Sequence, residues 1–264
     1  MDPILSFEQL EVSFPEGPVV SDITFQLKKG EILGLVGESG SGKSTIIKAA
    51  MGIMNPGGRI TNGSIIYQDT NLVELSEKKM NTLRGSQLGM IFQDAGGSLC
   101  PIRTIGDQIL ECMKVRGKAA RKQVKEEAIS LFDKLNFKGS EKIWNSYPFE
   151  LSGGMNQRVA VAITMLMKPK ILLADEPTSA LDNISRNQVL AELININDMG
   201  TSVILVTHDI DIVDAICDRV VVLKDGQIKE WGEAKEVLRA PKNEYTKLLI
   251  NSTRELRGES LWQA

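Results

Sequence analysis

The chain has 264 residues, of which 42% are hydrophobic and 25% are charged, the proportions of an ordinary soluble protein. Its 31 basic and 34 acidic residues give a net charge of −3, so the charge balance argues against a nucleic-acid partner. No apolar run approaches the roughly 18 residues that cross a bilayer, so work at a membrane would require a partner that provides the crossing.

The N-terminal part predicts antiparallel strands. Residues 1–8 lack the basic-then-apolar order of a signal peptide, and residues 4–27 alternate between apolar and polar side chains around a break at 15–18. Phe14 lies on or beside one of these strands. Taken alone, Phe14 is expected in the core, because buried aromatic side chains outnumber those that stack on ligands.

A glycine-rich segment follows the apolar run 32–36 and precedes a helical pattern. Its residues are Gly37, Glu38, Ser39, Gly40, Ser41, Gly42, Lys43, Ser44 and Thr45. A strand, this segment and a helix in that order are the context of the phosphate-binding P-loop, in which backbone N–H groups close around a phosphate chain. Lys43 is expected to reach the β- and γ-phosphates, and Ser44 to offer its hydroxyl to Mg²⁺. A flexible loop is the alternative, but such loops rarely carry Lys-Ser at this offset.

The middle of the chain changes from strands to helices. Strands are expected at 63–67 and 88–92, the second ending at Gln93. From residue 105 to 137 the apolar spacing is helical, with one face made by Ile105, Ile109 and Cys112. The basic run 116–122 predicts a solvated helix end or loop. The scattered cysteines favour a reduced, cytosolic compartment; they are Cys100, Cys112 and Cys217.

Residues 151–158, Leu-Ser-Gly-Gly-Met-Asn-Gln-Arg, open a helix that continues to Met167. Ser152 makes a good N-cap, and Gly153 and Gly154 expose N–H groups at the positive end of the helix. The segment is therefore a second candidate anion site. An ordinary capped helix start is the alternative, and the spacing alone does not exclude it.

The last third predicts a parallel sheet, because continuous apolar runs at 171–174 and 202–206 flank a helical segment. Asp175 ends the first run and Glu176 follows it. In P-loop proteins such a carboxylate holds Mg²⁺ through water, and an adjacent one deprotonates the attacking water. His208, the only histidine, ends the next strand. Strand ends of a parallel sheet meet in one crevice, so His208 is expected to face the same phosphate. A hairpin turn at 224–227 and helices around Pro241 complete the pattern.

These motifs resemble, in this order, those of ATP-binding cassette (ABC) ATPases. They are the P-loop, Gln93, residues 151–154, the Asp175-Glu176 pair, residues 179–182 and His208. The resemblance covers about the first 230 residues. It implies an α/β fold with a P-loop NTPase (RecA-like) core, an N-terminal antiparallel β subdomain and an inserted helical subdomain. The expected divisions are residues 1–94 and 160–232 for the β subdomain and core, 95–159 for the helical subdomain and 233–264 for a C-terminal helical tail.

The resemblance also implies an ATP- and Mg²⁺-dependent enzyme that works as a head-to-tail dimer. Ser152, Gly153 and Gly154 of one subunit close on the ATP held by the other subunit's P-loop, and Asp182 contacts the opposite site. Phe14, in place of the more usual tyrosine, stacks on adenine by its ring face. The implied catalytic residues are Glu176, His208 and Gln93, and the implied Mg²⁺ ligands are Ser44, Gln93 and Asp175.

Within that family the chain is similar to the peptide/nickel importer group. The similarity rests on residues 90–94, residues 147–155 and the late motif Pro241 to Leu249. Ala95-Gly96-Gly97 replaces the usual proline after Gln93-Asp94, which weakens the assignment. No cysteine follows Cys217, so the cysteine cluster of longer peptide importers is not expected, which favours nickel or metallophore members.

The function expected from this resemblance is that of the ATPase subunit of an importer of nickel, nickel-metallophore or di- or oligopeptides. Its partners would be a second ATPase subunit, two transmembrane permease subunits and, indirectly, an extracytoplasmic solute-binding protein, at the cytoplasmic face of the membrane. An exporter subunit is one alternative. A soluble ABC protein is another, but residues 94–151 leave no room for a long coiled coil. A small-molecule kinase or GTPase gives no reason for residues 151–154.

Overall fold

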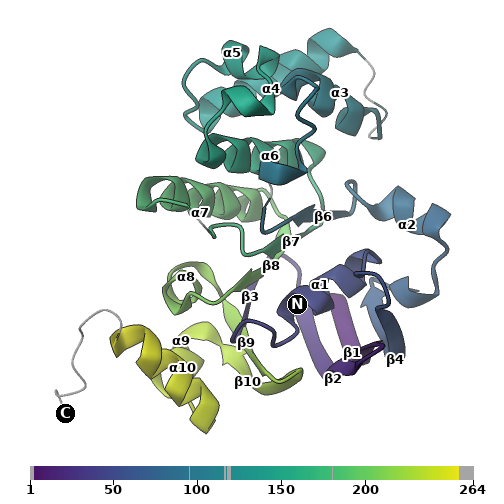
Figure 1. Ribbon diagram of the computed structural model, residues 1–264, viewed down its shortest axis with the longest axis vertical. Coiled ribbons are helices and arrows are strands. Elements are labelled where there is room, and N and C mark those ends of the chain that lie inside the picture. Colours follow the sequence, from purple (N-terminus) through teal and green to yellow (C-terminus); the bar gives the residue numbers. More distant parts are fainter. Residues whose placement is uncertain (1–2, 95, 116, 118–119, 180, 256–264) are drawn as a thin grey trace. The chain divides into compact units, whose positions relative to one another are not determined.

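The computed structural model describes residues 3–94, 96–115, 117, 120–179 and 181–255 (Figure 1). The chain divides into two compact units, one drawn from residues 1–80 and 202–264 and the other from residues 81–201. Residues 256–264 of the expected C-terminal tail, and residues 116, 118 and 119 of the basic run, lie outside the described residues. The subdomain boundaries expected from the sequence stay a prediction.

The first unit contains the antiparallel sheet expected at the N-terminus. Strands β1 (Pro3–Phe14), β2 (Gly17–Lys28), β4 (Arg59–Tyr67) and β5 (Thr70–Asn71) are ordered β2-β1-β4-β5. Buried and exposed residues alternate over parts of β1 and β2, and irregularities at Gln9 and Asp22, where φ is positive, shift the alternation. Phe7 and Phe25 are cross-strand partners, and their rings stack with centroids 4.5 Å apart.

Parallel strands in the same unit carry the P-loop. Strand β3 (Ile32–Val36) pairs with β8 (Ser202–Thr207) on one side and with β9 (Arg219–Lys224) on the other. Every residue of β3 and β8 is buried, which explains their continuous apolar sequences. Helix α1 (Lys43–Met51) follows β3, and α8 (Ile210–Ile216) follows β8.

The end of the chain forms a hairpin and two helices. Strand β10 (Gln227–Glu233) returns antiparallel to β9, and α9 (Ala234–Arg239) and α10 (Glu244–Glu255) lie on either side of Pro241, as expected. In Figure 1 the helices α9 and α10 lie together beside β9 and β10. Helix α2 (Glu77–Leu83) spans the residue at which the two units divide.

The second unit is mainly helical. Strand β6 (Leu88–Ile91) pairs in parallel with β7 (Ile171–Asp175). Helices α3 (Ile105–Val115), α4 (Arg121–Lys134) and α7 (Asn183–Asp198) pack on α6 (Gly153–Met167), and α5 (Ser140–Asn145) packs on α3 and α4 (Figure 1). The predicted face of α3 extends to one residue that the spacing did not single out. Ile105 and Ile109 are fully buried, Cys112 on the same face is half-buried, and Met113 beside it is fully buried.

Candidate active site

The P-loop connects β3 to α1 through two positions that only glycine fits. A Cβ on Gly37 would lie 2.1 Å from the carbonyl oxygen of Leu223, and one on Gly42 would lie 2.3 Å from Val20 Cγ1. Gly42 also has φ 97°, in the left-handed region that disfavours side chains. The loop is therefore seated closely on β2 and β9, with its backbone shape fixed by these contacts. The strand, loop and helix expected from the sequence are confirmed.

Lys43 lies inside this loop. Its Nζ donates hydrogen bonds to the carbonyl oxygens of Gly37, at 2.9 Å, and Glu38, at 2.7 Å, and the side chain is 5% exposed. A cation held within a ring of backbone groups at the N-terminus of a helix matches a chain of phosphates in charge and in donors. The residues present therefore fit a nucleoside triphosphate.

Phe14 and His208 belong to the same unit as the P-loop. Val36 and Thr207 are partners in the pairing of β3 with β8, so Gly37 and His208 leave neighbouring strands at the same level. His208 is exposed there. Phe14 ends β1 and is half-buried. Its ring packs on Gly58, where a Cβ would lie 2.7 Å from Cζ.

Gln93, Asp175 and Glu176 belong to the second unit, which brings two of them into contact. Ile91 pairs with Ala174, so the segments that follow β6 and β7 leave the sheet side by side. Gln93 Nε2 then donates a 3.3 Å hydrogen bond to Glu176 Oε2. Asp175 is buried at the last position of β7. Glu176 has φ 44°, a left-handed conformation that costs about 1–3 kcal/mol and occurs most often at functional sites.

The start of α6 has the capped, glycine-rich form expected from the sequence. Ser152 Oγ accepts a 3.3 Å hydrogen bond from the N–H of Met155. Gly153 is exposed, and a Cβ there would meet nothing within 4 Å, whereas a Cβ on Gly154 would lie 2.8 Å from Ser185 Oγ. A side chain at Gly154 would thus press on Ser185, whereas the described residues leave open space at Gly153.

Asp182 caps the next helix. Its carboxylate accepts hydrogen bonds of 2.9 Å from the N–H groups of Ile184 and Ser185, at the start of α7. The N–H and hydroxyl of Ser185 are the main cause that holds the pKa of Asp182 below its ordinary value. The carboxylate therefore stays ionised at neutral pH. Ala180, in the same motif, lies outside the described residues.

Sequence reasoning gave no role to Gln157, which connects the segment at Gly96 with the segment at Pro177. Its Nε2 donates to the carbonyl of Pro177, at 2.7 Å, and its Oε1 accepts from the N–H of Gly96, at 3.3 Å. Gln157 is buried on the same stripe of α6 as Val161 and Met165. The sequence signal that could have identified Gln157 as a buried, hydrogen-bonded residue is its place on an otherwise apolar stripe of the helix. A hollow of about 580 Å³ lies here, lined by nine residues including Gln93, Gly153, Gln157 and Leu181.

The expected Mg²⁺ ligands carry suitable donors. Ser44, Gln93 and Asp175 offer a hydroxyl, an amide and a carboxylate, the oxygen donors that Mg²⁺ prefers beside substrate phosphates. Ser44 belongs to the first unit and the other two to the second. Across the described residues, no three His, Cys, Asp or Glu side chains come together as a metal-binding group.

The described helices also include none with the length and apolar character needed to span a membrane.

Comparison with known proteins gives consistent matches. The family model described as "ABC transporter" matches residues 20–179. The metal-staphylopine import system ATP-binding protein CntD of Staphylococcus aureus is 38% identical, over 96% of this chain and 94% of that protein. The oligopeptide transport ATP-binding protein OppD of Salmonella typhimurium is 39% identical, over 97% of this chain and 78% of that protein.

A solved structure agrees with these sequence matches. It is the dimeric post-hydrolysis state of the ATP-binding cassette MJ0796 bound to ADP and Pi. It superimposes with a TM-score of 0.77 at 26% identity and covers 87% of this chain and 98% of that one. The expected P-loop NTPase fold is thereby confirmed.

Proposed function

Because the chain belongs to the ABC transporter family, as an ATP-hydrolysing importer subunit of the peptide/nickel group, we propose specific roles for the residues described above. Lys43 and the N–H groups of residues 37–45 hold the β- and γ-phosphates, and Phe14 stacks on the adenine. Ser44, Gln93 and Asp175 hold Mg²⁺, which when bound neutralises charge on those phosphates. The fixed loop shape and the buried Lys43 support this assignment.

Glu176 is the general base in this proposal. Its carboxylate takes a proton from water, the water oxygen bonds to the γ-phosphorus, and the bond to the ADP oxygen breaks. Gln93 orients Glu176 through the 3.3 Å hydrogen bond, and His208 contacts the γ-phosphate. The contact between Gln93 and Glu176 is the observation that carries this assignment, because it places a proton acceptor beside an expected Mg²⁺ ligand. The strained backbone at Glu176 supports it independently.

The complete site requires a second subunit. Ser152, Gly153 and Gly154 present N–H groups at the start of α6 to the ATP held by the partner's P-loop, and Asp182 contacts the opposite site. The open space around Gly153 supports this role, because none of the described residues lies close enough to require a glycine there. The related cassette MJ0796 is a dimer in its solved structure. The partner here is a second copy of the chain or a homologous ATPase subunit.

The subunit works at the cytoplasmic face of the membrane, bound to two permease subunits and served by an extracytoplasmic solute-binding protein. The relatives named above act in metal-staphylopine and oligopeptide systems, so the cargo is a metal complex of that kind or a peptide. CntD matches this chain over 94% of its own length, which favours a metal–metallophore complex.

Phosphate release from ATP by the purified chain, with and without Mg²⁺, tests the enzymatic part of the proposal. Hydrolysis that requires Mg²⁺, and whose rate per subunit rises with protein concentration as dimers form, is the expected result. Hydrolysis that is independent of Mg²⁺, or strictly proportional to protein concentration over the whole range, would contradict it.

A further inference from the structure

The late motif that suggested the importer group places one side chain against the P-loop. Tyr245 lies in the first turn of α10 and is 7% exposed. Its hydroxyl accepts a 3.1 Å hydrogen bond from the backbone N–H of Glu38. The carbonyl oxygen of Glu38 accepts the 2.7 Å hydrogen bond from Lys43 Nζ. Glu38 is therefore held on its N–H by the C-terminal helix and on its carbonyl by the lysine of the loop.

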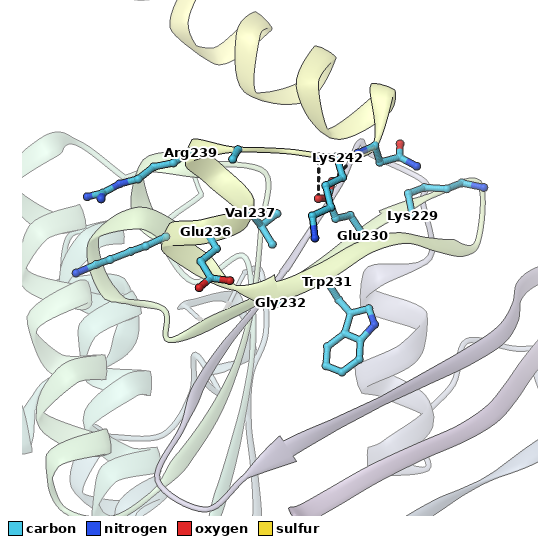
Figure 2. A pocket seen from close by; sticks show the side chains of 11 residues that line it. Lys229, Glu230, Trp231, Gly232, Glu236, Val237, Arg239 and Lys242 are labelled. Carbon is cyan, nitrogen blue, oxygen red and sulfur yellow. Dashed lines mark hydrogen bonds between the residues drawn. The ribbon is translucent and has the colours of Figure 1, made fainter.

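The segment that precedes α10 is anchored firmly enough to fix this contact. Figure 2 shows Glu230 on β10 directed toward this segment, while Trp231 points away to the other side of the strand. Glu230 accepts hydrogen bonds from the N–H of Lys242, at 2.8 Å, and of Asn243, at 3.0 Å. Burial acts to raise the pKa of Glu230, but these hydrogen bonds prevail and lower it, so the anchor stays ionised. Asn243 Oδ1 in turn accepts from the N–H of Tyr245, at 2.9 Å.

The ring of Tyr245 is held from a second direction. Lys224 Nζ lies 4.6 Å from the ring centroid, a cation–π contact from the end of β9. The preceding residue, Leu223, is the one whose carbonyl fits closely against Gly37. Burial is the main cause that raises the pKa of Tyr245, and the charges of Glu38 and Asp225 act in the same direction. The hydroxyl therefore keeps its proton at neutral pH.

We propose that Tyr245 is a positioning residue for the P-loop, through which helix α10 sets the affinity of the site for ATP. The inference rests on the proposed function, since it assumes that the P-loop binds ATP. A tyrosine that only attaches α10 to the unit would need its ring buried but not its hydroxyl on the loop backbone. Here the polar atom is directed at the peptide that Lys43 also holds.

Tyr245→Phe separates these two roles, because it keeps the ring and removes the hydroxyl. ATP affinity, measured by calorimetric titration, is expected to fall by about three- to tenfold, the range for loss of one hydrogen bond. The KM for ATP is expected to rise similarly, while kcat at saturating ATP changes less than about twofold. Tyr67→Phe is the control, because it removes a buried phenol hydroxyl from β4 and is expected to leave ATP affinity unchanged.

Glu230→Gln is the second variant, because it weakens the anchor of α10 and leaves Tyr245 intact. It is expected to lower ATP affinity in the same direction by a smaller factor. If Tyr245→Phe binds ATP as tightly as the wild type, or loses kcat alone, the positioning role is wrong. If Tyr67→Phe weakens ATP binding equally, the effect is one of general stability and the inference also fails. A wild-type chain that does not bind ATP would refute the proposed function itself, and this inference with it.

Discussion

Gln93 donates a 3.3 Å hydrogen bond from its side-chain amide to Glu176 Oε2, although the two residues lie 83 positions apart in the sequence. The parallel pairing of β6 with β7 brings them together, because each residue follows the end of its strand. Ser179 adds a hydrogen bond from its hydroxyl to the Gln93 carbonyl, at 3.3 Å. A change in the position of Gln93 would therefore also change the position of the side chain of Glu176, the proposed base.

The role of Lys43 can be tested by its removal. Lys43→Ala is expected to abolish tight nucleotide binding, since it deletes the cation inside the loop. A fluorescence titration with ATP measures the effect. Lys48→Ala is the matched control, because Lys48 lies in the last turn of the same helix and should leave the affinity near that of the wild type. Equal affinities for the wild type and Lys43→Ala would refute the P-loop assignment.

Gly153 tests whether the site is shared between subunits. Gly153→Arg should leave folding and ATP binding by the isolated chain intact, because the space around this residue is open. Turnover should fall by roughly tenfold or more, since the side chain would block closure on the partner's nucleotide. Gly153→Ala should have a milder effect on turnover, and Gly154→Ala should instead lower stability by its contact with Ser185. Normal hydrolysis by Gly153→Arg in the assembled transporter would contradict the shared site.

The buried ion pair of α6 and α7 predicts a pH dependence of stability. Glu192 Oε1 accepts a 2.8 Å hydrogen bond from Arg158 Nε, while among the described residues its Oε2 is buried without a hydrogen-bond partner. Burial raises the pKa of Glu192 to about 7, against the opposing effect of Arg158. Between these pKa values the folded state holds a proton that the unfolded state has released. The contribution of Glu192 to the free energy of unfolding is therefore fully present below pH 4.5 and is lost as the pH rises through 7.

Glu192→Gln should remove this dependence. The free energy of unfolding of the wild type, taken relative to the variant, is expected to fall by roughly 2–3 kcal/mol between about pH 4.5 and pH 8. Urea denaturation of both proteins at several pH values gives this difference directly and cancels the other titrating groups. A difference that is flat, or that rises with pH, would show that Glu192 is not protonated in the folded chain.

The sequence predicted the parts of the fold that depend on local pattern. Alternation identified β1 and β2, continuous apolar runs identified β3, β7 and β8, and the P-loop motif gave the turn into α1. Each of these signals is contained in a few consecutive residues. The degree of burial at Cys112 and Met113 could not be predicted in the same way, because both residues lie near the stripe set by Ile105 and packing decides which is buried more deeply.

The contacts between distant segments could not be predicted from local sequence patterns. Gln157 joins loops that lie 61 and 20 positions away, and Tyr245 reaches a backbone group 207 positions away. The apolar stripe of α6 can mark Gln157 as buried, but the partners of Gln157 and Tyr245 leave no signal in the sequence. The left-handed backbone at Glu176 was also unpredictable, since glutamate has no preference for it and the surrounding chain must impose it.

The most direct test of the account is Glu176→Gln, which keeps the shape of the side chain and removes the charge that accepts a proton. With both ATPase subunits of the dimer mutated, hydrolysis should slow by roughly a hundredfold or more while ATP affinity stays close to that of the wild type. Size-exclusion chromatography with ATP and Mg²⁺ should then show a trapped dimer. A doubly mutated protein that hydrolyses ATP at the wild-type rate would contradict Glu176 as the base.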